Sequence, residues 1–426
     1  MYCGGCFHDN TLVAAARQLG HAVTMVPLYL PLTLDESDQS RGTPIFFSGI
    51  NVFLEEKIPL FRRAPAWLHK LFASPKLLGL AAGFAGKTRA DELGELTVSM
   101  LRGEEGNQAR ELDELIAWLQ GQSKPELIGL SNALLLGLAR QLKRELKVPV
   151  VCSLQGEDYF LDSLPDAQRD LAWQILSERT RDIDLFIAPS RYFADLMSHR
   201  LNIATEKMRV VYNGINLAGF QNVETDRAKS KTRAGSPTIG FFARMCHDKG
   251  LDTIVETFIL LRERGTMADL KLKIGGGCGP SDEPMVEAAR QRLKSKGLLG
   301  AVEFFPNVTR PEKIRFLESL DVFCTPALYG EAFGLYVIEA MAAGVPVVEP
   351  RDAAFPEIIE ATGGGIVTEP NPSGLAEGIE SLILDPTAAR ALGAAGQRAV
   401  FEKFNADRMA RKTIDVFQEA ISQPAQ

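Results

Sequence analysis

Residues 329–346 read Tyr-Gly-Glu-Ala-Phe-Gly-Leu-Tyr-Val-Ile-Glu-Ala-Met-Ala-Ala-Gly-Val-Pro and place two carboxylates, Glu331 and Glu339, eight positions apart around Gly334. Helix formers follow this glycine, and a second glycine with Pro346 beyond it is a typical helix stop. Without a Cβ, Gly334 lets backbone N–H groups at a helix start approach a polar ligand, and the helix dipole favours an anion there. Because Glu331 precedes the helix and Glu339 lies inside it, the two carboxylates can hold two sets of hydroxyl groups beside that anion.

This stretch, read on through the two valines that follow Pro346, resembles the signature of glycosyltransferase family 4, also called glycosyl transferases group 1. Members of this family are retaining enzymes with two Rossmann-like domains that face each other across a cleft, the GT-B fold. The resemblance implies that Glu331 contacts the transferred sugar in catalysis and that Glu339 contacts the ribose of a nucleoside-diphosphate donor. It also implies that the residues between them bind the donor, namely Phe333, Gly334 and Leu335. For a Glu pair alone, an ordinary surface helix is the alternative.

The length and composition predict a globular chain of two domains. With 426 residues the chain exceeds what one hydrophobic core organises, and 46% of its residues are hydrophobic and 24% charged. A net charge of −7 argues against a dedicated nucleic-acid binder, whose surface would carry a basic surplus. No stretch approaches the roughly 18 apolar residues of a membrane-spanning helix, and the start lacks the pattern of a signal peptide. We therefore expect a cytoplasmic protein.

The cysteines and glycines near the start carry separate signals. Six scattered cysteines are too few for a disulfide scaffold. Cys3 and Cys6 have the spacing of a redox pair or of half a zinc site, but no second pair completes a metal-binding set, so we expect no metal. Gly4 and Gly5 predict a glycine-rich loop that faces a phosphate of the donor and runs into a helix over the apolar-periodic residues 12–19.

Gly20 then predicts the end of that helix, and residues 21–27 predict a strand. Rossmann-like domains begin with a buried strand ahead of the glycine loop, whereas this sequence begins inside the loop. We therefore expect the first strand of the N-terminal domain to be missing, because the stated start lies downstream of the true one or because the chain is truncated.

Apolar strand-like runs alternate with amphipathic helical ones, as in parallel α/β domains with doubly wound sheets. The strands predicted in the first half are 126–130, 149–154, 184–188 and 208–212. Those predicted in the second half are 238–242, 270–274, 302–305, 322–325 and 345–348. The polar segment 216–237 suits a linker, so we expect an acceptor-side domain at 1–215 and a donor domain at 216–405. The resemblance implies that a last helix near 406–422 returns to the first domain.

Two cations follow the predicted strand 238–242. Arg244 and Lys249 resemble the family's arginine and lysine between a strand and a helix. Because the leaving nucleoside diphosphate gains negative charge as the glycosidic bond breaks, fixed cations can stabilise the transition state more than the ground state. We assign both to catalysis, with solvated surface charges as the alternative. Gly276, in a glycine run after the next strand, is expected to bring its loop close to the nucleotide, unless that loop is merely flexible.

Gln155 precedes Gly156 at the place where many relatives carry a histidine. Because glutamine cannot take up a proton as imidazole does, a mechanism that needs a histidine base there is in doubt. Gln155 can still hydrogen-bond a sugar or an acceptor, and Glu157 or Asp158 can supply a carboxylate. We therefore expect Gln155 and Asp158 on the acceptor side.

Acceptor choice is expected to reside in the segment 32–120. Between Lys57 and Lys76 basic side chains alternate with aromatic and leucine side chains. Such a mixture fits a peripheral contact with the anionic inner face of a membrane. An amphipathic helical excursion packed on its own domain is the alternative, and we favour it.

Taken together, these features predict a hexosyltransferase-type enzyme that moves a sugar from a nucleoside-diphosphate donor to an acceptor hydroxyl with retention of configuration. The donor is a substrate, and no cofactor is expected. The acceptor can be a glycan, a lipid or a small molecule. Two alternatives remain open, a nucleotide-sugar epimerase on the same architecture and a non-catalytic sugar-nucleotide-binding protein.

Overall fold

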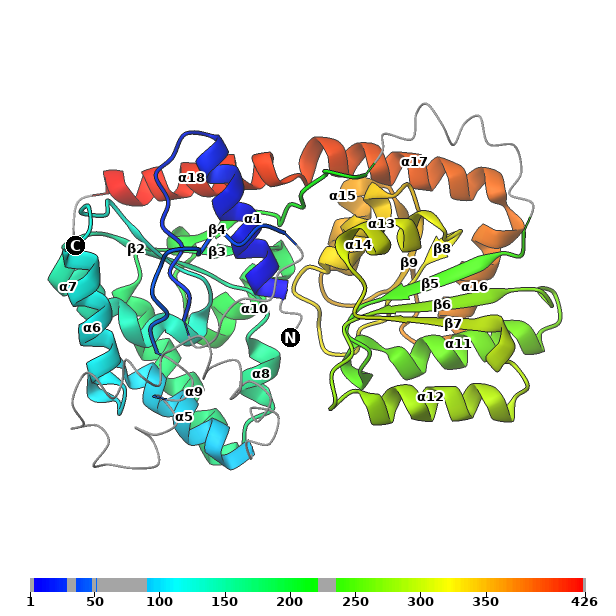
Figure 1. Ribbon diagram of the computed structural model, residues 1–426, viewed down its shortest axis with the longest axis horizontal. Coiled ribbons are helices and arrows are strands. Elements are labelled where there is room, and N and C mark those ends of the chain that lie inside the picture. Colours follow the sequence, from blue (N-terminus) through cyan, green and yellow to red (C-terminus); the bar gives the residue numbers. More distant parts are fainter. Residues whose placement is uncertain (1–3, 29–35, 48–50, 52–89, 221–234, 424–426) are drawn as a thin grey trace. The chain divides into compact units, whose positions relative to one another are not determined.

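The computed structural model describes residues 4–28, 36–47, 51, 90–220 and 235–423 (Figure 1). The chain forms two compact units. The N-terminal unit comprises Gly5–Val211 with Ala410–Gln426, and the C-terminal unit comprises Tyr212–Met409 with Met1–Gly4. Each unit contains one parallel sheet, which confirms the predicted α/β class.

The sheet of the N-terminal unit has four described strands in the order β1-β2-β3-β4, and every neighbouring pair is parallel. The strands are β1 (Ile128–Leu130), β2 (Val150–Ser153), β3 (Leu185–Ala188) and β4 (Met208–Val210). All four residues of β3 are buried, as expected for a parallel sheet covered on both faces. All four strands lie where the sequence predicts them, although each is shorter.

Helices surround this sheet. Those of the N-terminal unit are α1 (Gly4–Gln18), α5 (Ala90–Arg102), α6 (Ala109–Gln120), α7 (Ala139–Leu146), α8 (Asp158–Asp162), α9 (Asp166–Arg179) and α10 (Arg191–Leu201). The last helix, α18 (Ala406–Ser422), runs along one side of the sheet, with α5 and α9 on the other (Figure 1). Glu419 of α18 pairs with Arg209 of β4, so the end of the chain packs on the N-terminal unit.

The sheet of the C-terminal unit has six described strands in the order β10-β9-β8-β5-β6-β7, all parallel. They are β5 (Thr238–Phe242), β6 (Lys271–Gly276), β7 (Val302–Pro306), β8 (Val322–Phe323), β9 (Val347–Pro350) and β10 (Gly365–Thr368). The sequence predicts five of these strands. It misses β10, an edge strand whose four residues are all half-buried and carry no continuous apolar run.

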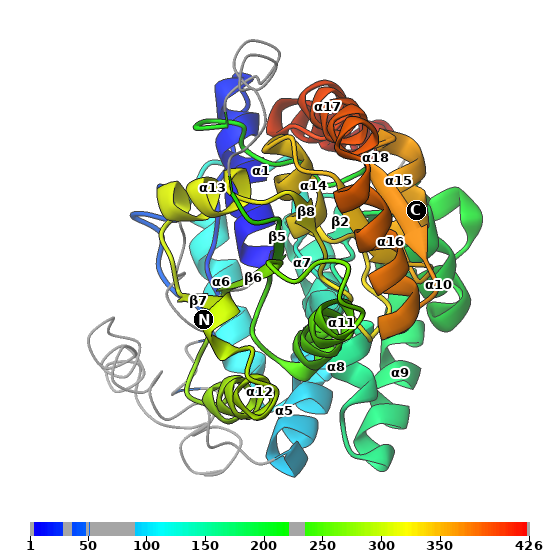
Figure 2. The same cartoon turned by 90° about the vertical axis from the view of Figure 1, so that its right-hand side faces the viewer.

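Helices cover both faces of this sheet, with α11 and α12 on one side and α13, α14 and α17 on the other (Figures 1 and 2). The helices are α11 (Leu251–Glu263), α12 (Glu283–Ser295), α13 (Arg310–Glu318), α14 (Leu335–Ala342), α15 (Phe355–Thr362), α16 (Pro372–Leu384) and α17 (Pro386–Lys403). The core between these layers is apolar, and Phe241 of β5 and Phe258 of α11 are both fully buried in it.

Two predictions for the start of the chain are wrong. Gly4 and Gly5 form the first turn of α1 instead of a loop before it, and a helix tolerates them there because its first N–H groups have no intrahelical partner. The predicted strand 21–27 is absent from these described residues. Side chains bind its backbone carbonyls instead, since Arg17 donates to Val23 and Thr43 donates to Met25. The predicted helix end is confirmed, because α1 ends at Gln18.

Some predictions fall outside the described residues. These are the basic and aromatic segment 57–76, residues 221–234 of the predicted linker, and Cys3. In the part of the chain that is described, no helix is both long and apolar enough to cross a membrane.

Candidate active site

The side chain of Glu331 lies at the centre of a polar cluster in the C-terminal unit. Its Oε2 accepts a hydrogen bond from Lys249 Nζ at 2.7 Å, from Tyr336 Oη at 2.8 Å and from Tyr329 Oη at 2.9 Å. Lys249 also donates to Tyr329 and stands 4.6 Å from the centre of its ring. The structure therefore brings together two predicted site residues, Glu331 and Lys249, and adds two tyrosines that the sequence analysis missed.

Charge dominates the environment of Glu331. Only 12% of its side chain and 22% of that of Lys249 are exposed. Burial alone would raise the pKa of Glu331, but the charge of Lys249 and the hydrogen bonds from Lys249, Tyr336 and Tyr329 outweigh it and hold this pKa below its usual value. Burial and the neighbouring carboxylate raise the pKa of Tyr336 well above its usual range. The cluster therefore favours the charged form of Glu331 and the uncharged form of Tyr336.

Gly334 directs the chain from Glu331 into α14. It is the N-cap of this helix with a φ of 86°, a conformation that favours glycine. Leu335 follows as the first helical residue. The Phe333 side chain is only 2% exposed and packs against Tyr212 and Phe404, so only its backbone remains for a ligand.

The second glutamate of the motif lies inside α14, as predicted. Glu339 Oε1 accepts from Lys313 Nζ of α13 at 2.7 Å, and their side chains are 15% and 12% exposed. Lys313 is a further partner that the sequence analysis missed. The two motif glutamates thus each pair with a lysine from a different element.

Arg244 follows β5 but does not join the Glu331 cluster through any interaction among the described residues. Its Nε donates to both carboxylate oxygens of Asp282, at 2.9 and 3.0 Å, and its Nη2 lies 2.7 Å from Asp282 Oδ1. Asp282 is buried and also accepts from the N–H of Gly279, whereas half of the Arg244 side chain is exposed. Asp282 therefore holds the guanidinium through Nε and Nη2, while half of the Arg244 side chain stays exposed to solvent.

Gly276 ends β6 where the chain passes close to its neighbour. A Cβ on this residue would stand 1.9 Å from the carbonyl oxygen of Ala243, and its φ is 123°. Only glycine fits this approach, which aligns the loop after β6 with the loop that carries Arg244. The close approach to Ala243 explains why this position needs glycine, while an approach of its loop to a nucleotide stays a prediction.

Glu349 is a buried carboxyl group that the sequence analysis missed. It lies in β9, is 0% exposed, and accepts from the Thr325 N–H at 3.2 and 3.3 Å. Burial raises its pKa well above the usual value, and the nearby charge of Glu331 acts in the same direction. The pKa values of these two buried glutamates are thus shifted in opposite directions, down for Glu331 and up for Glu349. The signal in the sequence that could have revealed Glu349 is a single acidic residue within the apolar run of a strand.

The predicted acceptor residues of the N-terminal unit follow β2. Gln155 Nε2 lies 3.1 Å from His8 Nδ1 of α1, and the Gln155 N–H donates to Glu157 Oε2 at 2.6 Å. Glu157 Oε1 accepts from the N–H of Ala133 at 2.7 Å, so this carboxyl group joins the loops after β1 and β2. Burial raises the pKa of Glu157, although its backbone hydrogen bonds oppose the shift.

Asp158 begins α8 and is 7% exposed. Burial raises the pKa of Asp158, against the opposing effects of backbone hydrogen bonds and of the Arg200 charge.

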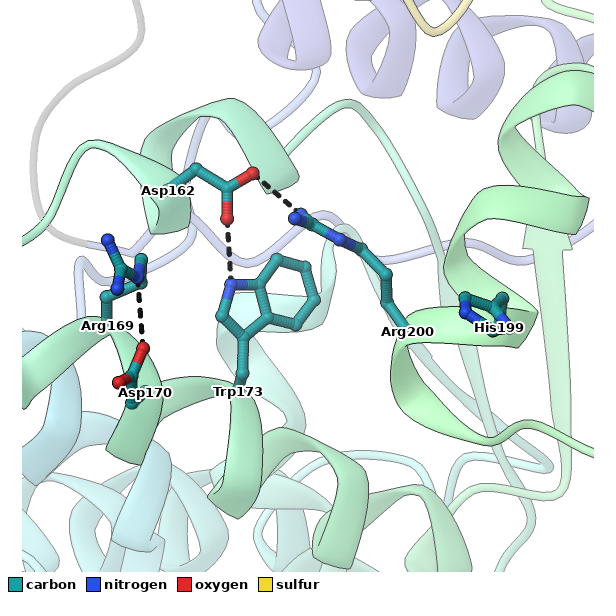
Figure 3. A pocket seen from close by; sticks show the side chains of 6 residues that line it. All are labelled: Asp162, Arg169, Asp170, Trp173, His199 and Arg200. Atoms are coloured by element: carbon teal, nitrogen blue, oxygen red, sulfur yellow. Dashed lines mark hydrogen bonds and ion pairs between the residues drawn. The ribbon is translucent and has the colours of Figure 1, made fainter. Parts of the chain in front are cut away.

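A cavity of about 460 Å³ lies at the end of α8 (Figure 3). Its lining residues are Asp162, Arg169, Asp170, Trp173, His199 and Arg200. Asp162 accepts from Arg200 at 2.8 Å and from the Trp173 indole at 3.0 Å, so these groups satisfy one another. None of the predicted site residues lines this cavity.

Two family models match consecutive stretches of the chain. The model described as Glycosyltransferase Family 4 matches residues 98–218, and the model described as Glycosyl transferases group 1 matches residues 222–399. A D-inositol 3-phosphate glycosyltransferase of Streptomyces bingchenggensis is 29% identical over 245 residues, which are 56% of this chain and 53% of that protein. A GDP-mannose-dependent alpha-(1-6)-phosphatidylinositol monomannoside mannosyltransferase of Mycobacterium tuberculosis is 28% identical over 212 residues, 47% of this chain and 53% of that protein. The chain spans about half the length of the curated relatives it matches.

Solved structures share the fold. Sucrose-phosphate synthase from Thermosynechococcus elongatus superposes with a TM-score of 0.61 at 21% identity, covering 73% of this chain and 78% of that one. Anabaena HepE, solved in complex with UDP, gives a TM-score of 0.62 at 18% identity, covering 74% and 84%. These likenesses confirm the predicted GT-B fold class. Because the two family models cover the end of the N-terminal unit and most of the C-terminal unit, the chain belongs to glycosyltransferase family 4, the group 1 glycosyl transferases.

Proposed function

We propose that this chain is a glycosyltransferase that moves a hexose from a nucleoside-diphosphate donor to an acceptor hydroxyl with retention of configuration. The observation that carries the proposal is the buried Glu331 cluster beside the Gly334 cap of α14. A carboxylate accepts hydrogen bonds from sugar hydroxyls, and a helix start with a nearby lysine binds phosphate. A site for a nucleotide sugar must bind both the hydroxyl groups of the sugar and the phosphates.

In this proposal Glu331 orients the transferred sugar, while Lys249 and Arg244 bind the diphosphate. Lys249 is held by three groups of the cluster, and Arg244 is anchored on Asp282 with its outer face exposed. Cations fixed in this way need no reorganisation when charge develops on the leaving group, so they stabilise the transition state. Glu339, braced by Lys313, binds the ribose.

The proposed reaction proceeds on one face of the sugar. The bond from the anomeric carbon to the diphosphate oxygen breaks, the acceptor oxygen bonds to that carbon from the same side, and the acceptor proton passes to the departing phosphate. Lys249 and Arg244 neutralise the charge that the diphosphate gains. Glu331 does not serve as the proton acceptor here, because its pKa is held low and its Oε2 already accepts three hydrogen bonds.

The comparisons support a uridine or guanosine donor as the first to test. Anabaena HepE was solved with UDP-glucose, and the mycobacterial relative is named as dependent on GDP-mannose. A thermal-shift panel of UDP, GDP, ADP and their hexose conjugates should single out one base, since a ligand at about 100 times its dissociation constant stabilises by about 2.7 kcal/mol. NMR of the product then gives the anomeric configuration.

Substitution of Glu331 by Gln is the direct test. We expect transfer to fall at least about a hundredfold, because the variant loses the charge that orients the sugar and fixes Lys249. Glu402→Gln, an exposed glutamate of α17 in the same unit, is the matched control. Full transfer by Glu331→Gln would overturn the assignment. A sugar product formed without any acceptor would instead identify an epimerase.

A further inference from the structure

His8 lies in α1 and meets Gln155, a residue just beyond β2. Its side chain is 7% exposed. Its Nδ1 lies 3.1 Å from Gln155 Nε2 and 3.0 Å from Asp9 Oδ1. The two residues are 147 positions apart, so no local pattern in the sequence could reveal the pair.

The second ring nitrogen of His8, Nε2, takes no part in these contacts. All the hydrogen bonds of this side chain use Nδ1, and Nε2 has no hydrogen-bond partner among the described residues. If Nδ1 donates to Asp9, Nε2 is an acceptor; if Nδ1 accepts from the Gln155 amide, Nε2 carries the hydrogen and is a donor. Because a hydroxyl group both donates and accepts, it can satisfy Nε2 in either state. Nε2 is not one of the fully buried polar atoms that lack a partner among the described residues, so it is open to a ligand group.

The surroundings hold this pair firmly. Gln155 follows β2 directly, and Glu157 binds the N–H groups of Gln155 and Ala133 at 2.6 and 2.7 Å. These contacts tie the loops at the carboxyl ends of two adjacent parallel strands. In open α/β sheets ligands bind beyond this edge.

We propose that His8 and Gln155 together bind one hydroxyl group of a sugar substrate, with His8 supplying the imidazole that Gln155 lacks. This inference rests on the proposed glycosyltransferase function. The hydroxyl belongs either to the hexose of the donor or to the acceptor, and both present the same chemistry. His8 is a binding residue in this role and transfers no proton.

Two substitutions of His8 distinguish the role of Nδ1 from the role of Nε2. An asparagine amide reaches only the position of Nδ1, so His8→Asn keeps the contacts to Gln155 and Asp9 and removes the ligand-facing atom. A glutamine amide reaches the position of Nε2, so His8→Gln keeps a polar group toward the ligand. We expect His8→Asn to lower kcat/KM for transfer about tenfold to a hundredfold, and His8→Gln to recover part of that loss. His21→Asn, an exposed histidine just beyond α1, is the matched control.

Separate measurements identify the source of the hydroxyl. With UDP and UDP-glucose as probes, weaker binding of UDP-glucose by His8→Asn with unchanged binding of UDP places the hydroxyl on the donor hexose. Unchanged binding of both probes with a raised KM for a soluble acceptor, tested with inositol, glucose and their phosphates, places it on the acceptor. Unaltered KM and kcat in His8→Asn, or equal losses in both variants at equal melting temperature, would overturn the inference. If the wild-type chain binds no nucleoside diphosphate or nucleotide sugar of the thermal-shift panel, the proposed function itself fails.

Discussion

Two buried glutamates, Glu331 of the C-terminal unit and Glu157 of the N-terminal unit, are held in opposite ways. In the C-terminal unit Glu331 pairs with Lys249 and two phenols, and its pKa is lowered. In the N-terminal unit the carboxyl group of Glu157 accepts only backbone N–H groups, and burial raises its pKa. One carboxylate is part of a charged pair, while the other is a brace between loops.

This difference indicates what each unit can bind. A charged pair can exchange partners when an anionic ligand arrives, because a phosphate competes with Glu331 for Lys249. A brace cannot exchange without loosening the loops it joins, so in the N-terminal unit we expect Gln155 and His8 to be the groups that meet a ligand. On the proposed function, we therefore expect the charged groups of the C-terminal unit to bind the diphosphate and the polar groups of the N-terminal unit to bind a hydroxyl.

The largest expected effect comes from breaking the charged pair. Lys249→Met leaves Glu331 buried without its cation, which we expect to cost about 3 kcal/mol of unfolding free energy and about two to three orders of magnitude in kcat. In the double variant with Glu331→Gln the stability should largely return while transfer stays lost. Urea unfolding and product assays measure the two effects separately.

The exposed pair Lys296 with Glu263 is the control for that experiment. Their atoms are also 2.7 Å apart, but the side chains are 35% and 54% exposed. Lys296→Met should therefore change stability by less than about 1 kcal/mol. A similar loss in both lysine variants would show that burial does not distinguish the Glu331 pair.

The two units also differ in how far their sites could be predicted from the sequence. Glu331, Gly334 and Glu339 lie within nine consecutive residues, so one local pattern gives both the helix and its acids. Lys313 and Asp282 escaped prediction because their contacts come from separate elements that only the folded sheet brings together.

In the N-terminal unit the pairing of His8 with Gln155 spans 147 positions and depends on α1 lying near the end of β2. The periodicity of α1 gives its apolar face, but it does not give the strand beside which α1 packs. The same limit explains why the four strands of this unit were predicted correctly while the strand predicted at 21–27 is absent. Strand composition is present there, but side chains take the carbonyls that a neighbouring strand would use.

The brace gives the next prediction. Glu157→Gln replaces one carboxylate oxygen by an amide that cannot accept from a backbone N–H, so either Gln155 or Ala133 loses its partner. We expect a loss of about 2 kcal/mol in unfolding free energy. Glu145→Gln, an exposed residue of α7, should be neutral within about 0.5 kcal/mol. A neutral Glu157→Gln would contradict the brace.

The pH dependence of these variants should have opposite signs. The pKa of Glu331 is lowered on folding, so its contribution to stability is present above the unfolded value of about 4.3 and is lost as pH falls through the folded value. The pKa of Glu157 is raised, so its contribution is present below about 4.3 and is lost as pH rises through the folded value. The stability deficit of Glu331→Gln should therefore shrink toward acid, and that of Glu157→Gln toward neutral pH, in urea unfolding from pH 3 to pH 8. If the stability deficits of both variants changed with pH in the same direction, the proposed difference between Glu331 and Glu157 would be wrong.

The smallest effect concerns the backbone behind Glu331. Ala353 has a φ of 52°, a left-handed conformation that is costly for a residue with a Cβ, and the N–H of the next residue, Ala354, donates to the Glu331 carbonyl at 3.2 Å. Ala353→Gly should raise the unfolding free energy by about 1 kcal/mol without lowering transfer, because the Glu331 side chain keeps its contacts. The same exchange at Ala394, exposed within α17, should instead cost about 1 kcal/mol. If Ala353→Gly stabilises the fold but slows transfer, the strained backbone itself positions Glu331, and the C-terminal site depends on conformation as well as on charge.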